Sequence, residues 1–404
     1  MKKEKSLAIR SKAAGRKTVF FFLFALCAAA LASCRKDDGG GPVPVGRVVV
    51  AYLGGDNNLS SEVPQKIEAL TAGLAAHGTH GDRLLIFHDA QRQEPALTEV
   101  YLDSRGAVRS QTVRTYDGSD SADGATMAAV CADARAMYPA ARFGLVVFSH
   151  ASGWLPEGMY LNPLLPVSPA NAAGVVSAPG PAAPGSRSIF RDGDNEMEIA
   201  ELADALPAGM FDWIVFETCF MAGVEVAYEL RGKAPVILAS SAEIVSPGFT
   251  EVYPRAMGYL LAGDIEGFAR AAFEHADAQS GWRRSATCSV IRTAGLQPLK
   301  EFIAANADFG VEVDVFDVQR FDRNAYRLFF DLEDYCGRLL PTDALRAELA
   351  RLIAGCVVWK AATPEFMTGH GGFVIERHSG LTSYIPQPEF ERLNQEYMKL
   401  KWNK

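Results

Sequence analysis

Two apolar runs of the sequence each end directly at a reactive side chain. Residues 143–149 lead into His150, and residues 212–218 lead into Cys219. Both runs are short, almost continuously apolar and rich in Val, Ile and aromatic residues, which is typical of buried strands in a parallel sheet. Ligand sites of open α/β sheets form at the carboxyl ends of the strands. The sequence therefore predicts a thiol and an imidazole at one sheet edge, with the thiol as the nucleophile and the imidazole as its proton-transfer partner.

The local setting of Cys219 favours a reactive thiol. We predict a helix over residues 221–230, and the partial positive charge of a helix N-terminus favours a thiolate. The backbone N–H groups at such a turn also stabilise an oxyanion. A lone Cys is more often a small buried apolar residue, and a lone His is more often a satisfied core residue. From the residues alone, both interpretations stay open.

The elements that position these residues alternate along the chain. This alternation predicts βαβ units and an α/β fold, with a mostly parallel sheet covered by helices on both faces. We expect one such domain over residues 47–295. Residues 296–404 are predicted to be mostly helical, with a late strand near 381–385, and to pack on the core. The predicted strands are 47–53, 83–89, 143–149, 212–218, 236–240 and 286–292, and the predicted helices are 64–76, 126–138, 198–206, 221–230 and two within 250–278.

One segment interrupts this alternation between the two reactive residues. Residues 162–191 are rich in Pro, Ala, Gly and Ser and have no periodicity, and they include Arg187 and Arg191. A loop of this length inside a compact domain is functional or disordered.

The N-terminus predicts export and lipid attachment. A basic leader precedes an apolar stretch, residues 19–32, which is too short for a spanning helix, so residues 1–33 are predicted to be a secretory signal. The signal ends in a segment that resembles the bacterial lipobox, with Cys34 as the acylated residue; a cleaved signal with an incidental cysteine is the alternative. Residues 34–46 form a Gly- and Pro-rich tether. Its start resembles surface-export signals, so we expect a lipoprotein that is anchored to the outer membrane and exposed at the cell surface.

The net charge and the cysteines of the sequence limit the classes of ligand and of site that we expect. The formal charge is −8, and it becomes −14 without residues 1–33, which carry seven basic side chains and one acidic one. Such an acidic body argues against nucleic acid as a partner. Gly54 and Gly55 belong to no phosphate-binding signature, so we expect no nucleotide. Five cysteines follow Cys34 without a CxxC pair, and their odd number predicts at least one free thiol, for which Cys219 is the candidate.

Several segments are similar to the clostripain family of cysteine peptidases. They are residues 49–59, 148–154, 212–221, 224–230 and 380–386, in the family's order over nearly all of the mature chain. The resemblance implies a caspase-like α/β/α sandwich in which Cys219 is the nucleophile and His150 the general acid/base. It also implies cleavage of peptides after Arg or Lys, no required cofactor, and no metal at the catalytic residues.

The sequence departs from the family pattern at two positions. Where the family usually has Gly after the catalytic His, this chain has Ala151, whose N–H is expected in the oxyanion hole with that of Cys219. A positive φ at Ala151 would cost about 1 kcal/mol. Where the family usually has Asp, this chain has Glu217, two residues before Cys219 and hence on the same face of a strand. A carboxylate there is expected to bind the basic substrate side chain; a salt-bridged Glu is the alternative.

Further site residues follow from their positions. Glu243, after the strand at 236–240, is a second candidate acid of the substrate pocket, and Trp154 is a candidate wall of the site; a solvated loop charge and core packing are the alternatives. Some relatives cut themselves between the His and Cys segments, so Arg187 and Arg191 are candidate processing sites. Some relatives use calcium, but residues 192–201 match the order of a calcium loop only in part, and no site is assigned.

We therefore predict a lipid-anchored cysteine endopeptidase. Two rival interpretations remain. The first is a caspase-like domain that binds a partner without cutting it. The second is an unrelated α/β binding lipoprotein, for which His150 and Cys219 would lie far apart.

Overall fold

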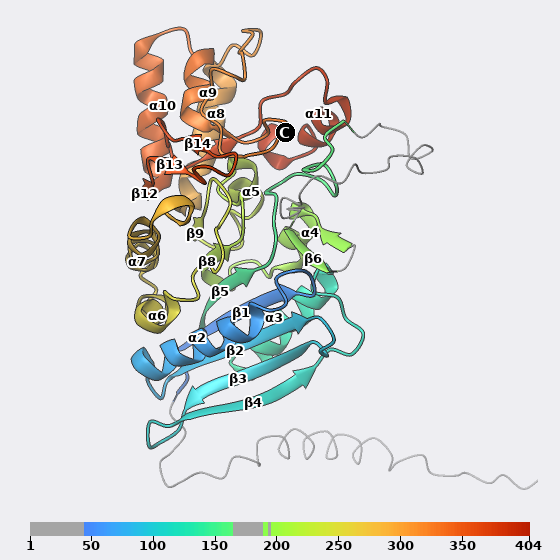
Figure 1. Ribbon diagram of the computed structural model, residues 1–404, viewed down its shortest axis with the longest axis vertical. Helices are drawn as coiled ribbons and strands as arrows, with labels where there is room; N and C mark the ends of the chain where they lie inside the picture. Colours follow the sequence, from blue (N-terminus) through green and yellow to red (C-terminus); the bar gives the residue numbers. More distant parts are fainter. Residues whose placement is uncertain (1–43, 165–188, 193–194) are drawn as a thin grey trace, which may run out of the picture. The chain divides into compact units, whose positions relative to one another are not determined.

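A nine-stranded mixed sheet forms the centre of the computed structural model, which describes residues 44–164, 189–192 and 195–404 (Figure 1). The strand order is β12-β10-β9-β8-β5-β1-β2-β3-β4. The five central strands are parallel, and each coincides with one of the predicted apolar runs. They are β1 (Arg47–Gly55), β2 (Asp82–Ala90), β5 (Arg142–Phe148), β8 (Phe211–Glu217) and β9 (Val236–Ala239).

Antiparallel strands extend the sheet at both edges. At one edge lie β3 (Ala96–Leu102) and β4 (Val108–Thr115), and at the other lie β10 (Thr287–Arg292) and β12 (Val357–Ala362). Of these four strands, only β10 was predicted. The β4 strand is largely exposed and so has no apolar run, and β12 lies in the region that we expected to be mostly helical.

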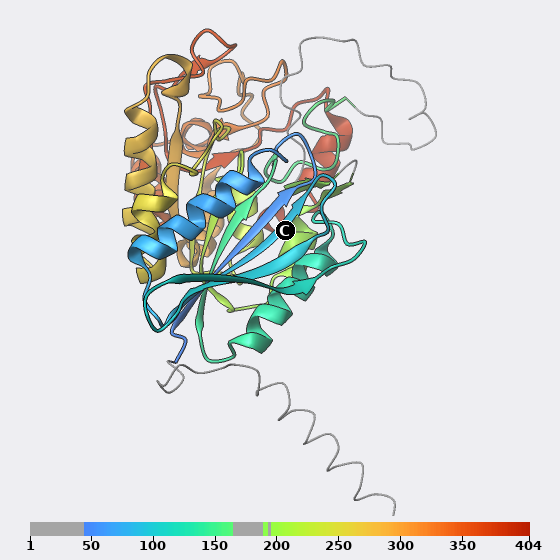
Figure 2. The same cartoon turned by 60° about the horizontal axis from the view of Figure 1, so that its bottom comes forward.

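Side chains of the central strands alternate between two apolar clusters, one on each face of the sheet. In β1, Val49 and Ala51 belong to one cluster, and Val48 and Val50 belong to the other. The first cluster is covered by α2 (Val63–His77), α6 (Tyr253–Ala262) and α7 (Ile265–Asp277). The second is covered by α3 (Gly124–Met137), α4 (Ile199–Ala205), α5 (Val224–Glu229), α8 (Leu296–Asn306), α9 (Leu332–Leu339) and α10 (Asp343–Cys356). Figure 2 shows α2 and α3 on opposite sides of the twisted strands, so the predicted α/β/α layering is confirmed.

The C-terminal region joins the same body as the sheet. Its strand β12 pairs with β10, and β15 (Thr382–Ser383) pairs with β11 (Phe330–Asp331). Thr382 also bridges to Gly223, in the turn after β8. The remaining short elements are β6 (Ile189–Asp192), β7 (Asn195–Met197), β13 (Glu365–Phe366), β14 (Phe373–Val374) and α11 (Glu391–Tyr397). Residues 44–404 form one compact unit.

The predicted signal, Cys34, most of the tether and Arg187 lie outside the described residues. Within the described part of the chain, no helix has the length and apolar character needed to cross a bilayer.

Candidate active site

The strand ends that precede His150 and Cys219 are neighbours. Strands β5 and β8 pair in parallel, and Phe148 at the end of β5 is in register with Glu217 at the end of β8. His150 and Cys219 each lie two residues beyond this register pair. Both therefore follow the carboxyl ends of adjacent parallel strands, where α/β folds place their ligand sites.

Two aromatic residues in a strained backbone conformation flank these positions. Phe190 has φ 63°, and its N–H donates to the carbonyl oxygen of His150 at 3.0 Å. Phe220, with φ 60°, directly follows Cys219, and its ring stacks on that of Phe329 with the centroids 4.4 Å apart. A bulky residue rarely adopts a positive φ, and such strain costs about 1–3 kcal/mol and concentrates at functional sites.

His150 is buried and held by an asparagine from the turn after β1. Its Nε2 lies 2.6 Å from Oδ1 of Asn58. Because an amide oxygen accepts, Nε2 carries the proton of the neutral ring, and Nδ1 is the nitrogen that accepts one. Asn58 lies in the 49–59 segment that resembles the clostripain family, and its sequence context predicted only a turn.

The turn that carries Cys219 runs beside the segment that follows β9. The N–H of Phe220 donates to the carbonyl oxygen of Ala242 at 3.0 Å, and the N–H of Ile244 donates to Sγ of Cys219 at 3.3 Å. These bonds place Glu243 next to the thiol.

The surroundings of Cys219 raise the pKa of its thiol. Burial raises its pKa to about 12, and the nearby Glu243 carboxylate raises it further. The Ile244 N–H and the Arg323 guanidinium act in the opposite direction but more weakly. Helix α5 begins only at Val224, so the expectation of a thiolate favoured by an adjacent helix N-terminus is wrong here.

Ala151 fits its position without backbone strain. It is fully buried, and its φ is outside the left-handed region. The cost that a positive φ would impose therefore does not arise, and the residue keeps the N–H expected in the oxyanion hole.

Glu217 forms a salt bridge, which was the alternative to its expected role as the acid that binds a substrate cation. Its Oε1 is 2.6 Å from Nζ of Lys66, and the Tyr253 hydroxyl donates to its Oε2 at 2.6 Å. The side chains of Lys66 and Glu217 are 0% and 1% exposed. Strand β8 ends at Glu217, so the rule that alternate residues share a face no longer applies at Cys219. Glu217 points to the face covered by α2 and α6, whereas Cys219 packs against the other apolar cluster.

Glu243 is the second candidate acid, and it also has a cationic partner. The Nε of Arg323 lies 2.6 Å from Oε2 of Glu243, and a terminal guanidinium nitrogen donates to Oε1 at 3.0 Å. The side chains of Arg323 and Glu243 are 15% and 12% exposed. This acid is not a solvated loop charge, and it stays accessible beside Cys219.

Trp154 is a core residue, contrary to its proposed place in the wall of the site. It is 2% exposed, and its ring centroid lies 5.4 Å from that of Tyr384 and 5.1 Å from that of Tyr397. These contacts join the segment after β5 to the C-terminal region, and they leave no face of the indole for a substrate.

The described cysteines are unpaired. Cys131, Cys288, Cys336 and Cys356 are free and buried, whereas Cys219 is free and partly exposed. Of the two arginines predicted as processing sites, Arg191 has its backbone in β6, in register with Glu196 of β7.

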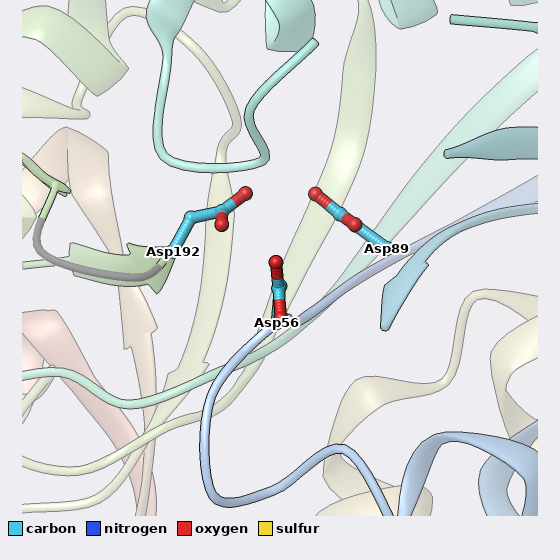
Figure 3. A group of neighbouring side chains, drawn as sticks. All are labelled: Asp56, Asp89 and Asp192. Carbon is cyan, nitrogen blue, oxygen red and sulfur yellow. The ribbon is translucent and has the colours of Figure 1, made fainter. Parts of the chain in front are cut away.

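Three aspartates from separate elements converge beside the site. Carboxylate oxygens of Asp56, Asp89 and Asp192 all lie within 4.8 Å of one another (Figure 3). Burial and a hydrogen bond with Asp89 raise the pKa of Asp192 to about 8. The sequence pattern connected Asp192 only with residues 193–201. Asp56 directly follows β1, and Asp89 lies at the end of β2. The parallel pairing of these two strands was the signal that could have placed the two carboxylates together.

Comparison with known proteins agrees with this architecture. Residues 188–263 match the clostripain family. No curated protein matches the chain. The chain is similar to an inactive zymogen C11 protease from Parabacteroides distasonis, with a TM-score of 0.75 and 28% identity over 89% of this chain and 98% of that one. It shares its fold with iotapain, a secreted C11 cysteine protease from Bacteroides thetaiotaomicron (TM-score 0.74, 22% identity, 89% of this chain and 99% of that one). The predicted resemblance to clostripain-like peptidases with a caspase-like fold is confirmed.

Proposed function

We propose that this clostripain-like cysteine peptidase cleaves peptide bonds with Cys219 as the nucleophile and His150 as the general acid/base. The observation that carries the proposal is the register of β5 and β8, since it sets both residues two positions beyond paired strand ends. The strained residues Phe190 and Phe220 support it, because each is directly bonded to or hydrogen-bonded with one of the two residues.

The reaction follows from the protonation states of the two groups. As Sγ of Cys219 attacks the substrate carbonyl carbon, its proton passes to Nδ1 of His150, and the N–H groups of Ala151 and Cys219 stabilise the oxyanion. The imidazolium then protonates the leaving amine as the C–N bond breaks. Water hydrolyses the thioester, His150 takes the proton of that water, and the thiol is restored. Asn58 keeps the ring in the tautomer that this sequence of proton transfers requires.

The finer part of the proposal is a preference for Arg or Lys before the cleaved bond. Glu243 is the acid that suits this role, because it lies beside Cys219 and keeps some exposure, whereas Glu217 is closed off by Lys66. Glu243 lines a pocket together with Leu238, Phe249 and Ile244, the residue whose N–H contacts Cys219. The apolar stem of a basic side chain suits such walls.

Activation by self-cleavage within residues 162–191 is a second part of the proposal. The raised pKa of the Cys219 thiol suits a chain that needs activation, and the similar P. distasonis protein is described as an inactive zymogen. Cleavage after Arg187 or Arg191 would match the proposed preference. A purified Cys219→Ala chain should stay intact; if it is still cut in this segment, another protease does the cutting.

The proposed chemistry needs no cofactor, because a thiol, an imidazole and two N–H groups supply every step. For calcium, which the family resemblance permits, Asp56, Asp89 and Asp192 form an oxygen-only set of the type that the ion takes. A bound ion would hold β6 to β1 and β2, and β6 carries Phe190, which contacts His150. Calcium should then raise the melting temperature of the wild type but not of Asp192→Asn.

Lipid attachment at Cys34 and placement at the outer membrane complete the proposal. The chain should sediment with membranes, and a Cys34→Ala chain should become soluble. A Cys34→Ala chain that still sediments with washed membranes would contradict the lipid anchor.

The decisive experiment compares the wild type with Cys219→Ala and His150→Ala on a peptide library. Both variants should lose at least about a thousandfold in kcat/KM. Cys356→Ala, which removes a buried thiol outside the site, is the control and should stay active. Full activity in Cys219→Ala would end the proposal. Binding of a peptide without cleavage by the processed wild type would favour the rival binding domain.

A further inference from the structure

Glu243 forms an ion pair with Arg323, whose side chain is of the same type as the basic substrate side chain that we propose for this pocket. Arg323 meets the carboxylate with two nitrogens, one on each oxygen, at 2.6 and 3.0 Å. This paired geometry is the one by which an arginine recognises a carboxylate. A third guanidinium nitrogen donates to the carbonyl oxygen of His370 at 2.7 Å. An arginine of the chain itself is thus bound to the carboxylate that a substrate arginine would need.

This ion pair lies within the catalytic environment. The residue after Glu243 donates its N–H to Sγ of Cys219, and the turn after Cys219 is bonded to Ala242. Tyr160, Cys219 and Glu243 all interact electrostatically with Arg323. A charge on Arg323 is therefore felt at the reacting sulfur as well as in the pocket.

The way in which Arg323 is held makes it displaceable. It belongs to residues 307–329, which form no helix or regular strand, and it reaches Glu243 across 80 positions of sequence. The pair keeps 15% and 12% exposure, in contrast to the 0% and 1% of the pair between Lys66 and Glu217. A guanidinium that swings outward gains hydration in place of its contact with Glu243, so a substrate cation can take over that contact.

We propose that Arg323 is a specificity-determining residue that competes with the basic substrate side chain for Glu243. This inference rests on the proposed function and deepens it. A basic residue must displace Arg323 to bind, and an uncharged residue need not. The internal arginine thereby weakens the preference for Arg and Lys and sets how selective the enzyme is.

The test measures binding and cleavage separately. In a Cys219→Ala background, titration calorimetry with an acetylated peptide that ends in arginine amide should show at least about tenfold tighter binding when Arg323→Met is added. Binding of the matching norleucine peptide should not change. Arg377→Met removes an exposed cation of the same region, which pairs with Asp334, and should leave both affinities unchanged.

With Cys219 present, Arg323→Met should lower KM for arginine substrates, and the ratio of kcat/KM for arginine over norleucine substrates should rise about tenfold. If the arginine peptide binds no better to Arg323→Met, or more weakly, the competition model is overturned. A failure of the catalytic proposal would look different, because Cys219→Ala would then keep its activity whatever Arg323 does. If Arg323→Met does not fold, as judged by circular dichroism, Arg323→Gln serves in its place, and equal binding of both peptides to it would also overturn the model.

Discussion

The two acid–cation pairs near the site differ in burial far more than in chemistry. Lys66 and Glu217 are sealed between α2, β8 and α6, and further hydrogen bonds reach the pair from Thr250 and Tyr253. Arg323 and Glu243 meet at the edge of the pocket, with the guanidinium on an irregular segment. The pair of Lys66 and Glu217 therefore stabilises the fold, whereas the pair of Arg323 and Glu243 is a contact that can exchange with another cation. We propose that this difference in solvent access decides which of the two acids can bind a substrate cation.

The largest expected effect comes from breaking the sealed pair. Lys66→Met leaves the Glu217 carboxylate buried without its cation, so we expect a loss of about 3–5 kcal/mol in the free energy of unfolding. Urea denaturation measures it. Lys399→Met, which removes an exposed lysine paired with Glu396, is the matched control and should cost less than about 1 kcal/mol. Equal losses in the two variants would show that burial does not separate the pairs.

Glu225 extends the comparison to a buried acid that forms no ion pair within the described part of the chain. Burial raises its pKa to about 7, although the N–H of Tyr384 and the hydroxyl of Ser383 donate to it. A raised carboxyl pKa stabilises the fold at low pH, and this contribution is lost as the pH rises from about 4.5 through 7. Glu225→Gln should remove that loss and gain up to about 3 kcal/mol over the wild type between pH 5 and pH 8. Urea denaturation at the two pH values tests this, with the exposed Glu348→Gln as control; an unchanged pH dependence would refute the protonation state.

The two paired acids should also differ in their effect on substrate selectivity. Glu243→Gln should lower kcat/KM for arginine substrates about tenfold relative to norleucine substrates, because the pocket loses its accessible charge. Glu217→Gln should change both substrates alike, through stability alone. Steady-state kinetics with the two peptides measures both ratios. A selective loss in Glu217→Gln instead would return the substrate acid to the position that the sequence suggested.

The smallest expected effect is on the stability of the open pair. Arg323→Met should lower the free energy of unfolding by clearly less than Lys66→Met does, since both side chains of its pair keep some exposure. Urea denaturation beside Lys66→Met provides the direct contrast. A loss as large as that of Lys66→Met would make Arg323 a structural residue and not a displaceable one.

Sequence patterns predicted the centre of the sheet well, for a physical reason. Strands buried on both faces must be apolar throughout, so β1, β2, β5, β8 and β9 are visible as runs. The exposed strand β4 and the late strand β12 have no such requirement, and they were missed. The same logic located His150 and Cys219, because strand ends can be read from the runs that precede them.

The partners of the site residues were harder to predict. Lys66 lies on a helix 151 positions before Glu217, and Arg323 lies 80 positions after Glu243. Nothing in the local pattern of a charged residue shows which distant charge it will meet. The position of Glu217 failed for a related reason, since the alternation of faces is a property of a strand and β8 ends at that residue.

The bond between the turn after β8 and the C-terminal region has a consequence for synthesis. Thr382 donates its N–H to the carbonyl oxygen of Ala222, and Tyr384 donates to Glu225, so residues made late brace the segment that carries the nucleophile. A nascent chain that ends before residue 380 lacks this brace. The turn that carries Cys219 therefore gains its full set of hydrogen bonds only after the C-terminal region has been made.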